Sequence, residues 1–108
     1  MLYDHRTYTC RPGTIRKQPV LYEQHGLAPQ TRHLTQPVLH AMTEAGDVNS
    51  FVHIRAYDSI EDRTRHRAAM QADPGWREYL RLSAEAGYLV SQEDRILPRY
   101  SFITAAGA

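Results

Sequence analysis

The stretch from Pro37 to Tyr57 decides the fold, and it reads PVLHAMTEAGDVNSFVHIRAY. Both ends have the apolar, aromatic and β-branched character of strands, and the residues at 45–47 between them supply a turn. The sequence therefore predicts a β-hairpin with strands over 36–43 and 50–57.

The second arm of this hairpin carries two different sets of side chains, because successive residues of a strand point to opposite faces. Val52, Ile54 and Ala56 form an apolar set, which we expect to pack under helices. The alternate set mixes aromatic rings with a base and a cation, which is unusual for a face in water. We expect this second set to line a cavity: Phe51, His53, Arg55 and Tyr57.

Two more strands are expected outside the hairpin. Residues 2–10 alternate in character without Gly or Pro, which is typical of a strand with two distinct faces. Residues 88–97 predict the last strand, which Pro98 stops. The chain therefore has four expected strands.

Helices are expected before and after the hairpin. The first covers about 15–25, with a kink or a late start near Pro19. After the N-cap candidate Ser59, a helix covers about 60–72 and a second helical piece covers 74–86. Glycines are expected to end the first helix and the last piece: Gly26 and Gly87.

The order β-α-β-β-α-β predicts an α+β, ferredoxin-like fold, in which four antiparallel strands carry two helices on one face. Residues 1–104 form one expected domain, and 105–108 form a frayed tail. Rings on the face opposite the helices would need a cover, which predicts a homodimer that packs sheet against sheet. The residues assigned to that face are Tyr8, Leu39, Phe51, His53 and Tyr57.

Composition excludes several classes of function. With 13 basic and 12 acidic residues the net charge is +1, so nucleic-acid binding has no electrostatic basis. Apolar runs stay far below the roughly 20 residues that span a bilayer, so no membrane role is expected. The charged start of the chain is unlike a signal peptide, which predicts a cytoplasmic protein. Cys10 is the single cysteine and is expected to be a small buried residue.

The segment 43–59, with its glutamate, glycine, asparagine and histidine, resembles the signature of the NIPSNAP family. The opening strand at 2–9 is also similar, and the matches together cover nearly the whole chain. The resemblance implies a dimeric α/β barrel, a fold shared with cofactor-independent monooxygenases, small cyclases, decarboxylases and chlorite dismutase-like haem proteins. Further matching positions are Pro12-Gly13, Arg63, Asp73-Pro74, Trp76 and Ser91-Gln92-Glu93.

The chain departs from the family pattern at positions assigned to the pocket. Arg55 stands where the family usually has a tryptophan, and Asp4 stands where it usually has a glutamate. Leu39 and His40 stand where it tends to have a glycine and an aromatic residue. The ligand expected here therefore differs from that of typical members.

His53 is the candidate general base, because a histidine near neutrality can exchange a proton with a ligand. The alternative is a structural histidine that is bonded to Asn49 or Glu44 and fixes the hairpin. Both loop residues are also counted among the expected ligand contacts.

Arg6 and Arg55 are candidates for binding a carboxylate or an enolate in a dry barrel, where charge-assisted hydrogen bonds are strong. Asp4 can neutralise one of them. The alternative is a buried network of Asp4 and Arg6 that crosses the sheet or the dimer seam. Charges on the helix over 60–72 are expected to be solvated, with Arg63 forming a local cap or salt bridge.

No metal or cofactor is expected. The six histidines lack the close paired spacings of zinc or iron sites. His40 and His53 can oppose each other across the hairpin, but two ligands without a nearby acid make a weak site.

Two functional hypotheses follow from these residues. The first is a cofactor-free enzyme of monooxygenase, cyclase, isomerase or decarboxylase type, which uses acid/base catalysis on an aromatic, polyketide-like or enolisable acidic substrate. Tyr8, Phe51 and Tyr57 would position that substrate. The second is a non-catalytic module that binds a ligand or another protein. The same lined barrel serves both.

Overall fold

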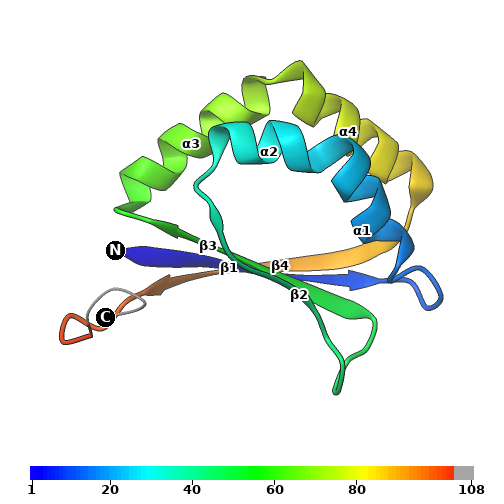
Figure 1. Ribbon diagram of the computed structural model, residues 1–108, viewed down its shortest axis with the longest axis horizontal. Helices are drawn as coiled ribbons and strands as arrows, with labels where there is room; N and C mark the ends of the chain where they lie inside the picture. Colours follow the sequence, from blue (N-terminus) through cyan, green and yellow to red (C-terminus); the bar gives the residue numbers. More distant parts are fainter. Residues whose placement is uncertain (104–108) are drawn as a thin grey trace.

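One antiparallel sheet of four strands forms the base of the computed structural model, which describes residues 1–103 (Figure 1). The expected tail at 105–108 lies outside the described residues. The strand order in the sheet is β2-β3-β1-β4, which confirms the predicted α+β, ferredoxin-like arrangement. The strands are β1 (Leu2–Cys10), β2 (Pro37–Met42), β3 (Ser50–Tyr57) and β4 (Leu89–Pro98).

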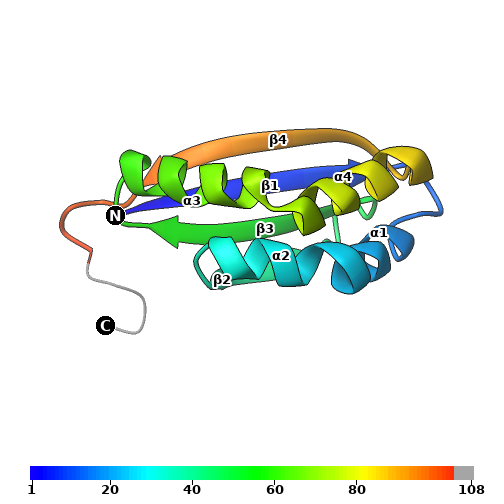
Figure 2. The same ribbon diagram turned by 90° about the horizontal axis from the view of Figure 1, so that it is seen from above.

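All helices lie on one face of this sheet, and the other face has no layer over it (Figures 1 and 2). None of the helices within residues 1–103 has the length and apolar character that crossing a membrane requires. The helices are α1 (Lys17–Leu21), a π-helical turn η1 (Tyr22–Gly26), α2 (Leu27–His33), α3 (Ile60–Ala72) and α4 (Pro74–Ala86).

Gly26 does not end the first helix, so that prediction is wrong. The backbone continues through η1 into α2 as far as His33. A Cβ atom at position 26 would lie 2.9 Å from ring carbons of both Tyr22 and Tyr79. Glycine is therefore needed here because two aromatic rings pack against the backbone, and not because the helix stops. The late start is confirmed, since Pro19 lies in the first turn of α1.

The ends of α3 and α4 follow the sequence closely. The Ser59 side chain caps α3 by accepting a hydrogen bond of 3.0 Å from the Asp62 amide. Asp73 caps α4 in the same way, accepting 2.7 Å from the Gly75 amide, with Pro74 in the first turn. Gly87 ends α4 with φ +66°, a left-handed conformation that favours glycine.

The two faces of β3 are reversed relative to our expectation. Tyr8 pairs with Phe51 in the register of β1 and β3, so the two side chains share a face. That face looks toward the helices, because Phe51 and Tyr8 line a cavity together with Tyr22 and Tyr79. The open face instead carries the apolar set: Val52, Ile54 and Ala56.

Leu39 lies on the open face, as expected, but the rings assigned to that face with it do not, so Leu39 stands apart from them and from the cavity that they line. It pairs with Ile54 across β2 and β3, which puts it on the open face with 45% of its surface exposed.

The helices pack against one another around a small core of their own. Leu34, Met70, Trp76 and Tyr79 form this cluster, and Met70 has no exposed surface. Because these side chains fill the contacts between helices, much of the space between the helix layer and the sheet stays open. Cys10 is buried, with 1% of its surface exposed, as predicted.

Candidate functional site

A cavity of about 730 Å³ lies between the sheet and the helices. All four strands of the sheet contribute to its floor, and η1 and α4 supply much of its roof. A volume of this size is typical of small-molecule sites, which are mostly apolar with a few placed polar groups. Its ring-bearing walls are Tyr8, Tyr22, His40, Phe51, His53, Trp76 and Tyr79.

The rings in this cavity are arranged in layers. Tyr8 stacks on Phe51 with centroids 4.7 Å apart and planes 12° from parallel. Tyr22 approaches His40, His53 and Tyr79 with its ring tilted or edge-on, at 5.2–5.9 Å. Such walls favour flat, partly apolar ligands, since aromatic faces and edges both remain available for contact.

His40 and His53 face each other across the hairpin, as predicted. Their ring centroids are 3.7 Å apart and their planes are within 14° of parallel. Burial and the charge of Arg55 lower the pKa of His40 to about 4. Burial, followed by the charges of His40, Arg55 and Arg6, lowers the pKa of His53 to about 3. Both imidazoles are therefore neutral at physiological pH.

Each imidazole also holds a buried nitrogen without a partner among the described residues, Nδ1 of His53 and Nε2 of His40. A neutral imidazole has one donor and one acceptor nitrogen, so each of these atoms has hydrogen-bonding capacity that no described residue uses. Within residues 1–103, no group of three or more His, Cys, Asp or Glu side chains is placed to hold a metal ion.

Asp4 is the centre of a buried ion network under α3. Its carboxylate accepts from Arg63 Nε at 2.7 Å and lies 3.4 Å from Arg6 Nε. Asp94 on β4 bonds the same two arginines, at 2.8 Å and 2.9 Å. The predicted structural network of Asp4 and Arg6 is confirmed. Arg63, expected to bond locally, instead joins α3 to two strands, so that prediction is wrong.

The two carboxyl groups of this network have opposite tendencies. Burial opposes ionisation of Asp4, but hydrogen bonds from Asp94 and Arg63 and the charge of Arg6 hold its pKa below the usual value. Burial raises the pKa of Asp94, and the neighbouring Asp4 raises it further. The network thus contains two cations and two acids and is close to neutral in charge.

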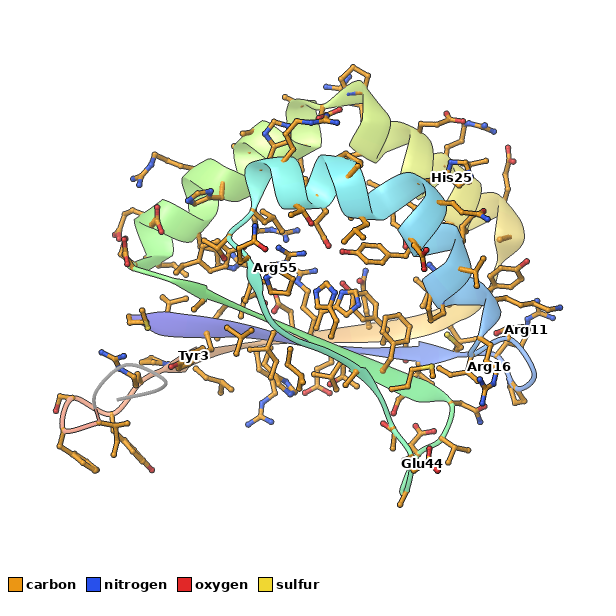
Figure 3. The ribbon with its side chains drawn as sticks, viewed as in Figure 1. Tyr3, Arg11, Arg16, His25, Glu44 and Arg55 are labelled. Carbon is orange, nitrogen blue, oxygen red and sulfur yellow. The ribbon has the colours of Figure 1, made fainter. Side chains whose placement is uncertain are left out.

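Arg55 is buried, with 5% of its surface exposed, and all of its hydrogen-bond partners are neutral. Its Nη1 donates to the Thr35 carbonyl oxygen, and its Nη2 donates to Oε1 of Gln30 at 3.0 Å. Figure 3 shows this side chain in the space between the sheet and the helices. Arg55 therefore carries a buried positive charge that no carboxylate of the described residues pairs.

Arg67 is a site residue that sequence reasoning missed. It lies on α3 one turn after Arg63 and lines the main cavity, as does Gln71 one turn later. Burial lowers the pKa of Arg67, and the charges of Arg6 and Arg63 lower it further. The i, i+4 spacing from Arg63, which the family pattern had already singled out, was the available signal.

A second, much smaller cavity of about 10 Å³ adjoins the first. Arg6, Tyr8, His53 and Arg67 line both cavities, so the two meet at these side chains. Its walls also include three residues expected at the site: Asp4, Arg55 and Tyr57.

Glu44 and Asn49 lie away from both cavities, in the loop between β2 and β3. Figure 3 shows Glu44 near the far end of this hairpin. Asn49 accepts 2.7 Å from the Cys10 amide through its backbone carbonyl and so ties the loop to β1. Neither residue bonds His53 among the described residues, so the expected bond of His53 to Asn49 or Glu44 is absent, and its ring instead stacks on His40 across the hairpin.

Comparison with protein families matches residues 3–103 to NIPSNAP. The chain belongs to the NIPSNAP family. Among curated relatives, the protein NipSnap homolog of Dictyostelium discoideum is 31% identical over 77 residues, which is 71% of this chain and 34% of that protein. The chain thus spans about a third of the length of this relative.

Solved NIPSNAP structures share the fold over nearly the whole chain. A protein from Agrobacterium tumefaciens is 32% identical with a TM-score of 0.86, covering 94% of this chain and 96% of its own. A NIPSNAP-like domain protein from Burkholderia xenovorans is 33% identical with a TM-score of 0.86, covering 96% and 89%. The fold alone is shared with a putative antibiotic biosynthesis monooxygenase from Deinococcus radiodurans. That protein is 15% identical with a TM-score of 0.61, and the match covers 99% of this chain and 100% of its own.

Proposed function

We propose that this NIPSNAP protein binds a flat, partly apolar small molecule in the cavity between its sheet and helices. The observation that supports this proposal is the cavity of about 730 Å³ with its aromatic walls. Two neutral imidazoles stand among these walls, and each has a buried nitrogen without a partner among the described residues. A ring system would fill the apolar part of the cavity, and a polar group on it would meet His40 or His53.

We further propose that His53 moves a proton to or from this ligand without a cofactor. In an enolisable substrate, the C–H bond next to a carbonyl breaks, the proton goes to the imidazole, and the electron pair moves onto the carbonyl oxygen. Arg6 lines the cavity and Arg55 lies beside it, so two guanidinium groups are close to the developing enolate. The same charges lower the pKa of His53 in the free protein, and an enolate would offset them.

Hydrogen–deuterium exchange tests this proton transfer. The parent protein in D₂O is expected to speed α-proton exchange of 2-tetralone, a flat enolisable ketone, and NMR measures the rate. His53→Gln should reduce the protein-dependent rate by about 100-fold or more, since acid–base groups contribute on that order. His25→Gln is the matched control, because His25 lies on an exposed part of η1 outside the cavities.

A non-catalytic binding module is the second candidate. The observation that favours it is the pKa of about 3 at His53, which makes this imidazole a weak base in the free protein. This alternative would be favoured if the parent protein bound 2-tetralone but exchanged its α-protons no faster than His53→Gln does. The proposed proton transfer would then be rejected.

A homodimer through the open face of the sheet completes the proposal. Ile54 stands in register between His5 and Leu39 on that face, and exposed Leu39 continues the apolar row. Sedimentation equilibrium at micromolar concentration should give twice the chain mass of 12.4 kDa. Ile54→Arg should give a folded monomer, because a charge in the seam would be desolvated. A parent protein that sediments as a monomer would contradict the proposed dimer.

A further inference from the structure

The charges around the cavity do not balance. Four guanidinium groups gather there, those of Arg6, Arg55, Arg63 and Arg67, all of which stand on β1, β3 and α3. Asp4 and Asp94 pair with Arg6 and Arg63, and each acid lies next to both cations. Two positive charges are therefore left over.

The two remaining arginines differ in their surroundings. The Arg55 guanidinium donates hydrogen bonds to neutral acceptors in the protein, the Thr35 carbonyl and the Gln30 side chain. Among the described residues, the Arg67 guanidinium has no carboxylate within 4.0 Å and no side-chain hydrogen-bond partner, in contrast to Arg63 and Arg65 on the same helix. Arg67 and Arg6 are also the only cations among the described residues that line the main cavity, which has no acidic wall residue. Arg67 is thus a guanidinium directed at the cavity with its donors unused.

We propose that the cavity takes a carboxylate-bearing aromatic ligand whose carboxylate is bound by Arg67, with Arg6 beside it, while the ring lies among the aromatic walls. This inference rests on the proposed binding function and names the ligand class. A planar guanidinium matches a carboxylate in bidentate geometry, and such charge-assisted pairs are strong where water is excluded. A partly buried cation without a counterion has an unfavourable desolvation free energy. A ligand carboxylate that pairs with this cation offsets that free energy, which favours binding of the anion.

The geometry also relates the carboxylate to the imidazoles. Arg67 and His53 line both cavities, so an anion at Arg67 lies at the junction next to His53. The ring system then extends from this junction toward Tyr8, Phe51 and Tyr22, which wall the larger cavity. The ligand therefore has its charged end at the junction of the two cavities and its apolar body in the larger one.

A matched pair of probes tests the proposal on the full chain. Isothermal titration calorimetry at neutral pH compares 2-naphthoate with 2-naphthamide, which share the ring and differ in charge. The parent protein is expected to bind the acid about tenfold more tightly or better, the lower end of what a hydrogen bond to a charged group contributes. Arg67→Gln should abolish this preference by weakening the acid alone, and Arg67→Lys should retain part of it.

Arg65→Gln is the control, because Arg65 lies on the same helix with 71% of its side chain exposed and pairs with Asp62. It should keep the preference for the acid. Equal affinities for the two probes in the parent protein would overturn the inference and leave aromatic binding intact, whereas binding of neither probe would overturn both. An Arg67→Gln variant that prefers the acid as before would show that Arg67 is not the anion-binding group.

Discussion

Replacing Asp4 by Asn is expected to lower the free energy of unfolding by about 3–5 kcal/mol, the usual cost of breaking a buried ion pair from one side. Asp4 is 4% exposed and lies next to both Arg6, on the same strand, and Arg63, on α3. An amide of the same shape cannot balance their charge, so two guanidinium groups would share Asp94 alone. Denaturant unfolding at neutral pH, followed by circular dichroism, measures the loss.

The control for this prediction is an ion pair on the surface. Glu78→Gln breaks a pair with Arg81 on α4 in which both side chains are about half exposed, so little change is expected. Asp94→Asn should cost less than Asp4→Asn, because 32% of the Asp94 side chain is exposed and water can replace part of its bonds. Equal effects of all three substitutions would mean that burial of Asp4 does not decide the stability of the network.

The order of the elements could be predicted because it depends on local signals. The alternation of side-chain character indicates the strand Ser50–Tyr57. Ser59 and Gly87 are residue types that favour the two ends of a helix, so the caps could be recognised from the sequence. The extension through Gly26 could not be predicted in this way. Whether a glycine ends a helix or accommodates a neighbour depends on Tyr79, which packs against it from a helix more than 50 residues away.

The faces of β3 were assigned wrongly for a physical reason. Alternation separates two sets of side chains but does not say which set faces the helices. Apolar residues usually face them, which favoured Val52 and Ile54. Here the helices supply their own apolar cluster and cover a cavity, so the polar and aromatic set, including His53 and Arg55, faces inward.

Arg67 shows why part of the site stayed hidden. Its helix is rich in charges, and such a pattern normally indicates a solvated face. The carboxylates that pair Arg63 come from β1 and β4, at positions 59 and 31 residues away in the sequence, so neither pairing leaves a local signal. Only the fold shows that Arg63 is neutralised and Arg67 is not.

Acid should destabilise the protein through His53 and His40. In the unfolded chain both take up a proton near pH 6.5, whereas in the folded protein their pKa values are about 3 and about 4. The unfolded state therefore binds more protons, so stability is fully present above about pH 6.5 and falls as the pH drops toward the folded values. From about pH 6.5 to about pH 4.5, His53 alone should cost about 2 kcal/mol, because the full slope of about 1.4 kcal/mol for each pH unit is reached only when the unfolded imidazole is mostly protonated.

His53→Phe isolates this contribution, because a phenyl ring fits among Tyr8, Tyr22 and Phe51 and has no proton to gain. The difference in unfolding free energy between the variant and the parent should shift by about 2 kcal/mol in favour of the variant between about pH 6.5 and about pH 4.5. The protonated imidazole is unfavourable because burial and the charges of His40, Arg55 and Arg6 all oppose it. Urea unfolding at the two pH values gives the comparison. If the unfolding free energies of parent and variant changed equally with pH, His53 would have the same pKa in the folded and unfolded chains. That result would mean that His53 is surrounded by water and not buried among aromatic side chains.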